Sequence, residues 1–399
     1  MRTVVSLLAL AGLALAQEPR DAALRDALIG LRRAAPADRD EAVAAVLALE
    51  PRPEDVLRRI RGGVTVPAKE PGWHLLEAVD DRGVARPYQL YVPESLAARE
   101  KPGPLLVYLH GGVNRPEFLR GEGEVGYGQL WIESAEKEAF PIAFPAARHD
   151  CMWWSDAGAR HIRAVVRDAK RHVPVDDDRI FASGFSDGGS GCYFLAMAAP
   201  EPFAGFLPMN GHPAVASLSG HQLYLRNLKR SPLFAAMTLD DQLYPAAEVL
   251  DHLTLAMRAG APIRIVSYEG GNHRPVYFEQ QRATFEGFLR DVFRDATPQE
   301  LEWSCADPET GRVAWLEILE TGPAEGDAEA PPDLNPIVQP GRPRLGFSAD
   351  RAFGGEGVKV AAVVDDSVAQ GMGLQEGDVV VVKAPGGDVE YEIDEVHHI

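Results

Sequence analysis

One short stretch constrains the fold of this chain more than any other, the ten residues Ile180 to Gly189, which read Ile-Phe-Ala-Ser-Gly-Phe-Ser-Asp-Gly-Gly. An apolar, β-prone run ends in Gly-x-Ser-x-Gly and a helix-prone run over 192–199 follows, so the pattern predicts a strand, a tight turn and a helix. Gly184 and Gly188 stand where a side chain would clash across such a turn. We expect a strained backbone at Ser186, with its hydroxyl clear of the strand.

Strand-like and helix-like segments alternate on both sides of this stretch. The strand candidates are 73–79, 87–92, 105–109, 141–144, 180–183, 205–209, 233–238 and 263–268. The helix candidates among them are 127–139, 159–171, 188–199, 246–259 and 276–293. The first two strands flank a turn over 80–83 and predict an antiparallel hairpin, whereas the later alternation predicts a parallel sheet. The predicted fold class is therefore α/β, a mostly parallel eight-stranded sheet with helices on both faces.

A serine nucleophile needs a base, and the base needs a carboxylate that orients it. Ser186 precedes two strand ends that offer these groups in order. The strand over 233–238 runs into Asp240 and Asp241, and the strand over 263–268 runs into a glycine-rich loop that ends at His273. His273 is the predicted base, and both aspartates remain open as the acid on the residues alone.

The loop after the strand over 105–109 reads His110-Gly111-Gly112. Glycines let a backbone N–H approach a substrate oxygen closely, and one such donor stabilises a transition state by roughly 3 kcal/mol. We expect the N–H groups of Gly111 and Gly112, with that of Asp187 at the helix N-terminus, to form an oxyanion hole. His110 is expected to brace the loop.

Two adjacent tryptophans, Trp153 and Trp154, lie between a strand and a helix on the same edge of the predicted sheet. They are candidates for an acyl pocket, and core packing or loop anchoring is an equal alternative.

The His-Gly-Gly, Gly-x-Ser-x-Gly, strand-end aspartate and late histidine together resemble the α/β-hydrolase superfamily over about residues 70–295. Within it, Asp241-Gln242-Leu243-Tyr244-Pro245 is similar to a loop of secreted polyhydroxybutyrate depolymerases and feruloyl esterases, which favours Asp241 as the acid. The resemblance implies hydrolysis of a carboxylic ester with an aromatic, carbohydrate-linked or polymeric substrate. Ser186 would attack, His273 would carry the proton and Asp241 would hold the imidazole.

Two other functions are compatible with this sequence. Prolyl-oligopeptidase-type peptidases share such a catalytic domain, although no propeller-like repeat precedes it here. The other alternative is a peptide-binding protein whose hydrolase domain only supports the C-terminal tail.

The tail from Arg344 resembles a PDZ domain of the bacterial, protease-associated kind. Leu345-Gly346-Phe347 matches the carboxylate-binding loop of that family, and 373–378 reads Gly-Leu-Gln-Glu-Gly-Asp. Such a module captures a peptide C-terminus by adding it as a strand. The chain stops at Ile399, where the second wall of the groove is due, so we expect a truncated module.

The N-terminus predicts export, to the periplasm or the medium. Arg2 precedes an apolar run over 4–15, and Ala14-Leu15-Ala16 suits cleavage after Ala16. The formal net charge of −19 argues against a nucleic-acid partner, and no later apolar run could span a membrane. The histidines show no metal-ligand spacing, and no cofactor or metal is implied.

These observations divide the 399 residues into six segments. They are a signal peptide (1–16), a small helical region (17–66), a catalytic domain (67–296), a β-hairpin extension (297–320), a linker (321–343) and a partial PDZ-like domain (344–399). The extension is predicted because strand-like runs over 301–305 and 313–319 flank a turn over 307–311. Three cysteines allow one disulfide and leave one thiol over.

Overall fold

The computed structural model describes residues 21–61, 66–99, 101–113, 125–320, 347–350, 353–355, 358–363, 368–371, 373–383 and 392–397. The chain divides into two compact units, Met1–Asn335 and Pro336–Ile399. The predicted signal peptide (1–16) and linker (321–343) lie outside the described residues.

The first unit is built on one eight-stranded sheet with the order β1-β2-β4-β3-β5-β6-β7-β8. Its strands are β1 (Gly72–Val79), β2 (Ala85–Val92), β3 (Gly103–Leu109), β4 (Ile142–Pro145), β5 (Val175–Phe185), β6 (Gly205–Met209), β7 (Leu233–Thr238) and β8 (Ile263–Tyr268). β1 and β2 form an antiparallel hairpin, β2 also pairs antiparallel with β4, and all pairs from β4 to β8 are parallel. This is the α/β-hydrolase strand order, so the predicted fold class is confirmed.

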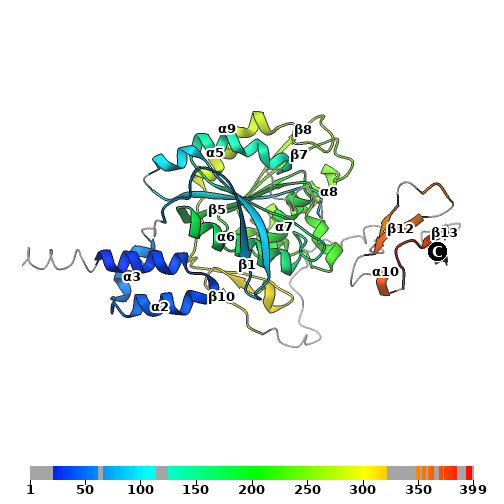
Figure 1. The fold of residues 1–399 in the computed structure, drawn as a ribbon. Coiled ribbons are helices and arrows are strands. Elements are labelled where there is room, and N and C mark those ends of the chain that lie inside the picture. Colours follow the sequence, from blue (N-terminus) through cyan, green and yellow to red (C-terminus); the bar gives the residue numbers. More distant parts are fainter. Residues whose placement is uncertain are drawn as a thin grey trace, which may run out of the picture. The chain divides into compact units, whose positions relative to one another are not determined.

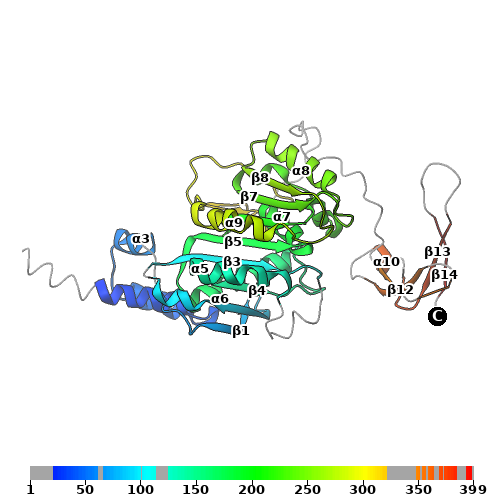
Figure 2. The same ribbon diagram turned by 90° about the horizontal axis from the view of Figure 1, so that it is seen from above.

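Helices cover both faces of this sheet (Figures 1 and 2). α6 (Asp156–His172), α7 (Asp187–Ala198) and α8 (Ala246–Arg258) pack on one face, around a core that includes Val165, Leu195 and Leu253. α5 (Ile132–Glu138), preceded by the 3-10 helix η3 (Gly126–Trp131), and α9 (Phe278–Asp291) cover the other face with Trp131 and Phe285. The central strands β3, β4, β6 and β7 are therefore buried on both sides, as continuous apolar strands require.

The central strand β5 begins five residues before its predicted start at 180, in the polar run Asp176-Asp177-Asp178-Arg179. Charges from other elements stabilise this run: Arg32 and Lys170 pair with Asp177, and Arg294 pairs with Asp178. Arg32, Lys170 and Arg294 lie 145, 7 and 116 residues from these aspartates in the chain. A pattern of local hydrophobicity therefore cannot predict this extension.

The N-terminal part of the first unit is helical, as expected. Residues 21–33 form a helix, followed by η1 (Pro36–Asp38), α2 (Arg39–Leu47) and α3 (Pro53–Arg61). A small core of Leu24, Leu28 and Val46 joins these helices. Arg32 attaches them to the sheet, since its guanidinium donates to Val175 O at 3.1 Å as well as to Asp177.

The predicted hairpin over 297–320 is wrong in its pairing. Residues 301–305 form no strand, and a two-residue pair joins β9 (Arg312–Val313) to β10 (Leu316–Glu317) after the short helix η6 (Pro308–Thr310). The reason lies in Asn227, whose side chain donates to Ser304 O at 2.8 Å and accepts from Ser304 N at 3.0 Å. These bonds occupy backbone groups that a partner strand would need.

The second unit contains a four-stranded antiparallel sheet in the order β11-β12-β13-β14. The strands are β11 (Phe347–Ala349), β12 (Val358–Val363), β13 (Val379–Lys383) and β14 (Glu392–His397), with the short helix α10 (Val368–Gly371). Val360, Ala369, Leu374 and Val380 form its core. Phe347 opens β11, whereas Leu345 and Gly346 of the expected carboxylate loop lie outside the described residues.

All three cysteines, Cys151, Cys192 and Cys305, are free thiols. Within the described part of the chain, no helix combines the length and the apolar character that a bilayer crossing needs.

Candidate active site

Ser186 occupies the turn between β5 and α7, at the carboxyl edge of the sheet. Its backbone has φ 58° and ψ −122°, which is strained for a residue with a side chain. The turn closes only because its neighbours lack side chains: a Cβ on Gly188 would stand 1.9 Å from Leu109 O, and one on Gly184 would stand 2.5 Å from the Gly188 carbonyl carbon. The predicted strain and the predicted roles of both glycines are confirmed.

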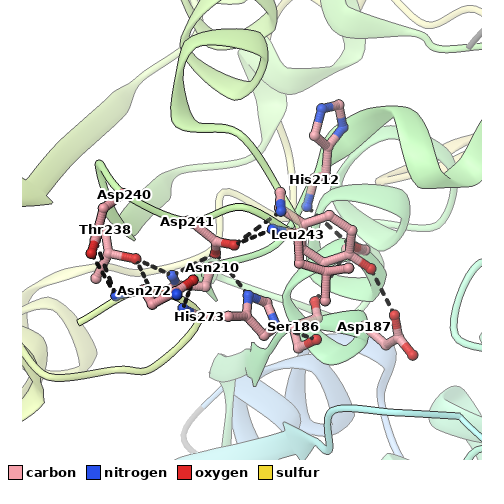
Figure 3. Close-up of polar contacts among 12 residues, drawn as sticks. Ser186, Asp187, Asn210, His212, Thr238, Asp240, Asp241, Leu243, Asn272 and His273 are labelled. Atoms are coloured by element: carbon pink, nitrogen blue, oxygen red, sulfur yellow. Dashed lines mark hydrogen bonds and ion pairs between the residues drawn. The ribbon is translucent and has the colours of Figure 1, made fainter. Parts of the chain in front are cut away.

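In the structure, polar contacts connect Ser186 to His273 and His273 to one aspartate (Figure 3). His273 Nε2 lies 2.8 Å from Ser186 Oγ, and His273 Nδ1 lies 2.7 Å from Asp241 Oδ2. The three residues follow β5, β8 and β7, so the parallel strands deliver them to one edge. The rings of Phe185 and Tyr244 pack on His273 at centroid distances of 4.9 and 5.5 Å.

Asp241 is 4% exposed and is held on both carboxylate oxygens. Oδ1 accepts from the N–H groups of Leu243 and Tyr244 at 2.9 and 3.0 Å, and Oδ2 accepts from Asn210 Nδ2 at 2.8 Å as well as facing His273. Burial raises the pKa of this carboxyl, but the hydrogen bonds from Tyr244, Asn210 and His273 outweigh burial and leave the pKa below its usual value. Asp241 is therefore ionised at neutral pH, with one carboxylate oxygen against His273 Nδ1.

The neighbouring Asp240 has a different partner. Both of its oxygens lie 3.0 Å from the N–H of Asn272, the residue before His273. The hydroxyl of Thr238 donates to the carbonyl of the same Asn272. Asn272 has a φ of 52°, so these two bonds hold a turn in the left-handed region. The residues alone left open which of the two aspartates is the acid. In the structure, Asp241 contacts the imidazole, whereas Asp240 holds the loop behind it.

The His-Gly-Gly loop passes beside the serine. A Cβ on Gly111 would stand 3.1 Å from Ser186 Cβ, and Gly112 has a φ of 70°, a conformation that favours glycine. The next N–H, that of Val113, donates to Asp187 Oδ2 at 3.0 Å and is thereby occupied. Gly111 and Gly112, the expected oxyanion donors, therefore lie between two residues that other contacts hold in place, His110 and Val113.

His110 and Trp153 anchor the start of this loop. His110 is 4% exposed, and its Nε2 accepts from Ala147 N at 3.0 Å, which makes Nδ1 the protonated nitrogen in the neutral ring. The indole of Trp153 donates to His110 O at 2.9 Å and is completely buried. Trp153 thus anchors the loop and packs in the core rather than offering surface to an acyl group, and Trp154, 7% exposed, belongs to the same core.

Asn210 is a part of the site that sequence reasoning missed. It follows β6 directly, donates from Nδ2 to both Asp241 Oδ2 and Thr238 Oγ1 at 2.8 Å, and accepts from the Tyr277 hydroxyl at 2.6 Å. The rule that placed the other residues, a polar side chain at the end of a parallel strand, would have found Asn210 after 205–209. Tyr277 carried no such signal, since it lies in the loop before α9.

Among the described residues, no group of three or more histidine, cysteine, aspartate or glutamate side chains is placed to hold a metal ion. The reacting groups that the structure does assemble are a hydroxyl, an imidazole and a carboxylate. Their arrangement suits proton transfer from the hydroxyl to the imidazole, with the carboxylate behind it.

No protein-family model matches the chain. Two curated proteins are similar to parts of it. The bifunctional acetylxylan esterase/xylanase XynS20E of Neocallimastix patriciarum is 25% identical over 134 residues, which are 33% of this chain and 19% of that protein. NocK of Nocardia uniformis subsp. tsuyamanensis, named as an esterase, is 29% identical over 136 residues, 32% of this chain and 39% of that protein.

Solved structures also resemble the chain. A thermostable esterase has a TM-score of 0.44 at 20% identity, over 56% of this chain and 63% of that one. The acylaminoacyl peptidase of Pyrococcus horikoshii has a TM-score of 0.44 at 13% identity, over 59% of this chain and 44% of that one. The chain spans less than two thirds of the length of each of these four proteins.

Proposed function

We propose that this protein is a serine hydrolase that cleaves carboxylic esters through an acyl-enzyme. The observation that carries the proposal is the continuous contact from Ser186 Oγ to His273 Nε2, 2.8 Å, and from His273 Nδ1 to Asp241 Oδ2, 2.7 Å. A general base within hydrogen-bond reach of a hydroxyl, itself oriented by a buried carboxylate, is the arrangement that activates a serine.

In the first half of the reaction, Ser186 Oγ bonds to the ester carbonyl carbon and its proton passes to His273 Nε2. Asp241 stabilises the imidazolium through Nδ1–H. The N–H groups of Gly111, Gly112 and Asp187 are the proposed donors to the oxyanion of the tetrahedral intermediate. The carbon–oxygen bond to the alcohol then breaks, and His273 returns its proton to the departing alkoxide.

In the second half, His273 takes a proton from water, whose oxygen attacks the acyl carbon. The second tetrahedral intermediate collapses, Ser186 Oγ leaves, and His273 protonates it. The acid product departs and the enzyme returns to its starting protonation state. No other co-reactant is required.

The preference for esters rests on sequence. The stretch from Asp241 to Pro245 resembles that of secreted polyhydroxybutyrate depolymerases and feruloyl esterases, and both similar curated proteins are named as esterases. We therefore propose an ester with an aromatic, carbohydrate-linked or polymeric component as the substrate. Export also stays a proposal, supported by the apolar run over 4–15 with the small residues that follow it.

For the tail, we propose a PDZ-like peptide-binding module, supported by the match of 345–347 and by the antiparallel order of β11 to β14. Binding of the full chain to a peptide with a free C-terminus, measured by fluorescence anisotropy against the same peptide amidated, tests this proposal. Equal binding of both peptides would contradict carboxylate capture.

The catalytic proposal is tested with nitrophenyl acetate, butyrate and octanoate together with methyl ferulate. We expect turnover in the wild type and its loss in Ser186→Ala, with circular dichroism unchanged. Ser183→Ala is the matched control, because Ser183 lies on the same strand and its hydroxyl donates to Leu207 O, away from the reacting groups. Full activity in Ser186→Ala would overturn the serine mechanism, and cleavage of peptides at rates comparable to esters would favour the peptidase alternative.

A further inference from the structure

The side chain of Asp187 occupies an unusual position for a charged group beside an oxyanion hole. It is the first residue of α7 and directly follows the nucleophile. Its Oδ2 accepts from Val113 N at 3.0 Å, and its Oδ1 accepts from the Tyr244 hydroxyl at 2.7 Å. The carboxylate therefore binds two loops that are 131 residues apart in the sequence.

Tyr244 belongs to the loop that carries the acid. Its N–H donates to Asp241 Oδ1 at 3.0 Å, and its ring packs edge-on against His273. Its hydroxyl donates to Asp187 Oδ1. One half-buried residue thus contacts the acid, the base and the carboxylate beside the nucleophile.

The His-Gly-Gly loop needs such a contact. Gly111 and Gly112 have no side chains by which the fold could hold them, and glycine has more backbone freedom than any other residue. His110 anchors one side of the pair through Ala147 and Trp153. On the other side, the bond from Val113 N to Asp187 holds the backbone, and the Val113 side chain packs against the core.

We propose that Asp187 and Tyr244 form a clasp that holds the oxyanion loop in register with the acid and the base. Both side chains have a positioning role: the backbone N–H of Asp187 is a proposed oxyanion donor, whereas its carboxylate and the Tyr244 hydroxyl act through Val113 on the donors Gly111 and Gly112. The inference rests on the proposed function. It predicts that loss of the clasp lowers kcat and leaves KM nearly unchanged, because the oxyanion forms only as the bound ester reacts and is absent from the bound ground state.

Three variants distinguish the effect of the hydrogen bonds in the clasp from that of the negative charge on Asp187. Asp187→Ala removes both bonds. Tyr244→Phe removes one and keeps the ring on His273. Asp187→Asn keeps an oxygen that accepts from Val113 and offers an amide donor to the Tyr244 oxygen, so it removes the charge and preserves the clasp.

The experiment measures kcat and KM for nitrophenyl butyrate and the rate at which a fluorophosphonate labels Ser186. We expect Asp187→Ala to lower kcat about 10- to 100-fold, less than or comparable to complete loss of one oxyanion donor. Tyr244→Phe should lower kcat about tenfold, and Asp187→Asn should lower kcat less than Asp187→Ala does. The double variant of Asp187→Ala with Tyr244→Phe should match Asp187→Ala within about twofold, because the two residues act through one contact.

Tyr88→Phe is the matched control. Its hydroxyl donates to Asp168 at 2.8 Å, the same chemistry, between β2 and α6, which contribute no group to the site. This control should alter stability and leave kcat unchanged.

Wild-type kcat in both Asp187→Ala and Tyr244→Phe would overturn the clasp, as would multiplicative effects in the double variant. Equal damage from Asp187→Asn and Asp187→Ala would also overturn it, since charge would then matter instead of the bonds. If Ser186→Ala keeps its turnover, or if the wild type neither turns over esters nor reacts with the fluorophosphonate, the proposed function fails and the clasp fails with it. A serine-dependent wild type with unaffected clasp variants contradicts the clasp alone.

Discussion

Asp240 accepts the N–H of Asn272 on both carboxylate oxygens at 3.0 Å, while the adjacent Asp241 faces His273. Two consecutive aspartates at the end of β7 thus serve opposite sides of the loop that carries the base. One fixes the backbone of that loop, and the other fixes the ring. Substitutions at the two positions should therefore have different kinetic effects.

Asp241→Asn should lower kcat by about 10⁴, the loss known for the equivalent aspartate of a serine protease, because an amide donor favours the imidazole tautomer that cannot accept the serine proton. Asp240→Asn keeps an acceptor for Asn272 N–H and should retain kcat within about threefold. Steady-state kinetics on nitrophenyl butyrate check both. A larger loss in Asp240→Asn than in Asp241→Asn would reverse the assignment.

Gly188→Ala should prevent the turn at Ser186 from forming. The added Cβ would stand 1.9 Å from Leu109 O, which is backbone of β3 and cannot move without distorting the sheet. We expect no soluble folded protein, or a Tm lowered by about 6–12 degrees, which a loss of about 3 kcal/mol gives in a domain of 150–250 residues. Gly30→Ala, on the exposed face of the helix over 21–33 with no atom within 4 Å of its Cβ, should instead stabilise by about 0.5–1 kcal/mol. Comparable Tm values for the two variants would contradict the packing argument.

His161 should make the protein sensitive to acid. His161 is 1% exposed, and its Nε2 has no hydrogen-bond partner among the residues that the structure describes. Burial, with the neighbouring Arg86, lowers its pKa from 6.5 to about 4. The folded state therefore binds this proton less readily than the unfolded state, and stability present above pH 6.5 is lost as the pH falls towards 4. The shift corresponds to about 3 kcal/mol.

Urea unfolding of the wild type and His161→Gln at several pH values checks this effect. The wild type should lose about 3 kcal/mol more than the variant between pH 6.5 and pH 4. His149→Gln, on the exposed loop before Cys151, should follow the wild type. Parallel curves for wild type and His161→Gln would contradict a buried neutral imidazole.

The number of reactive thiols should show directly whether the three cysteines are free. Burial raises the pKa of Cys151 to about 11 and that of Cys192 well above its usual value, while Cys305 is half-buried with a smaller rise from the same cause. Titration with a disulfide reagent at pH 8 should give one reactive thiol, Cys305, in the native protein and all three after unfolding. A single thiol in both states would show that Cys151 and Cys192 are bridged.

The strands were the most predictable part of the fold. Every predicted strand from 73–79 to 263–268 lies within an observed strand or overlaps it. The central strands β3, β4, β6 and β7 gave the clearest signal, because burial on both faces demands continuous apolar runs. The polar start of β5 and the pairing within 297–320 were not predictable. Arg32, Lys170 and Asn227 determine them from other parts of the chain.

By itself the sequence determined the strand–turn–helix around Ser186, since Gly184 and Gly188 are required locally by backbone sterics. It also determined the chain order of serine, acid and histidine at successive strand ends. The choice between Asp240 and Asp241, the burial of Trp153, and the contacts of Asn210 and of the Asp187 carboxylate were decided only by the tertiary structure. Each depends on side-chain direction across strands that are neighbours in the sheet and distant in the chain, and hydrogen-bond geometry varies over tenths of an ångström that no sequence spacing specifies.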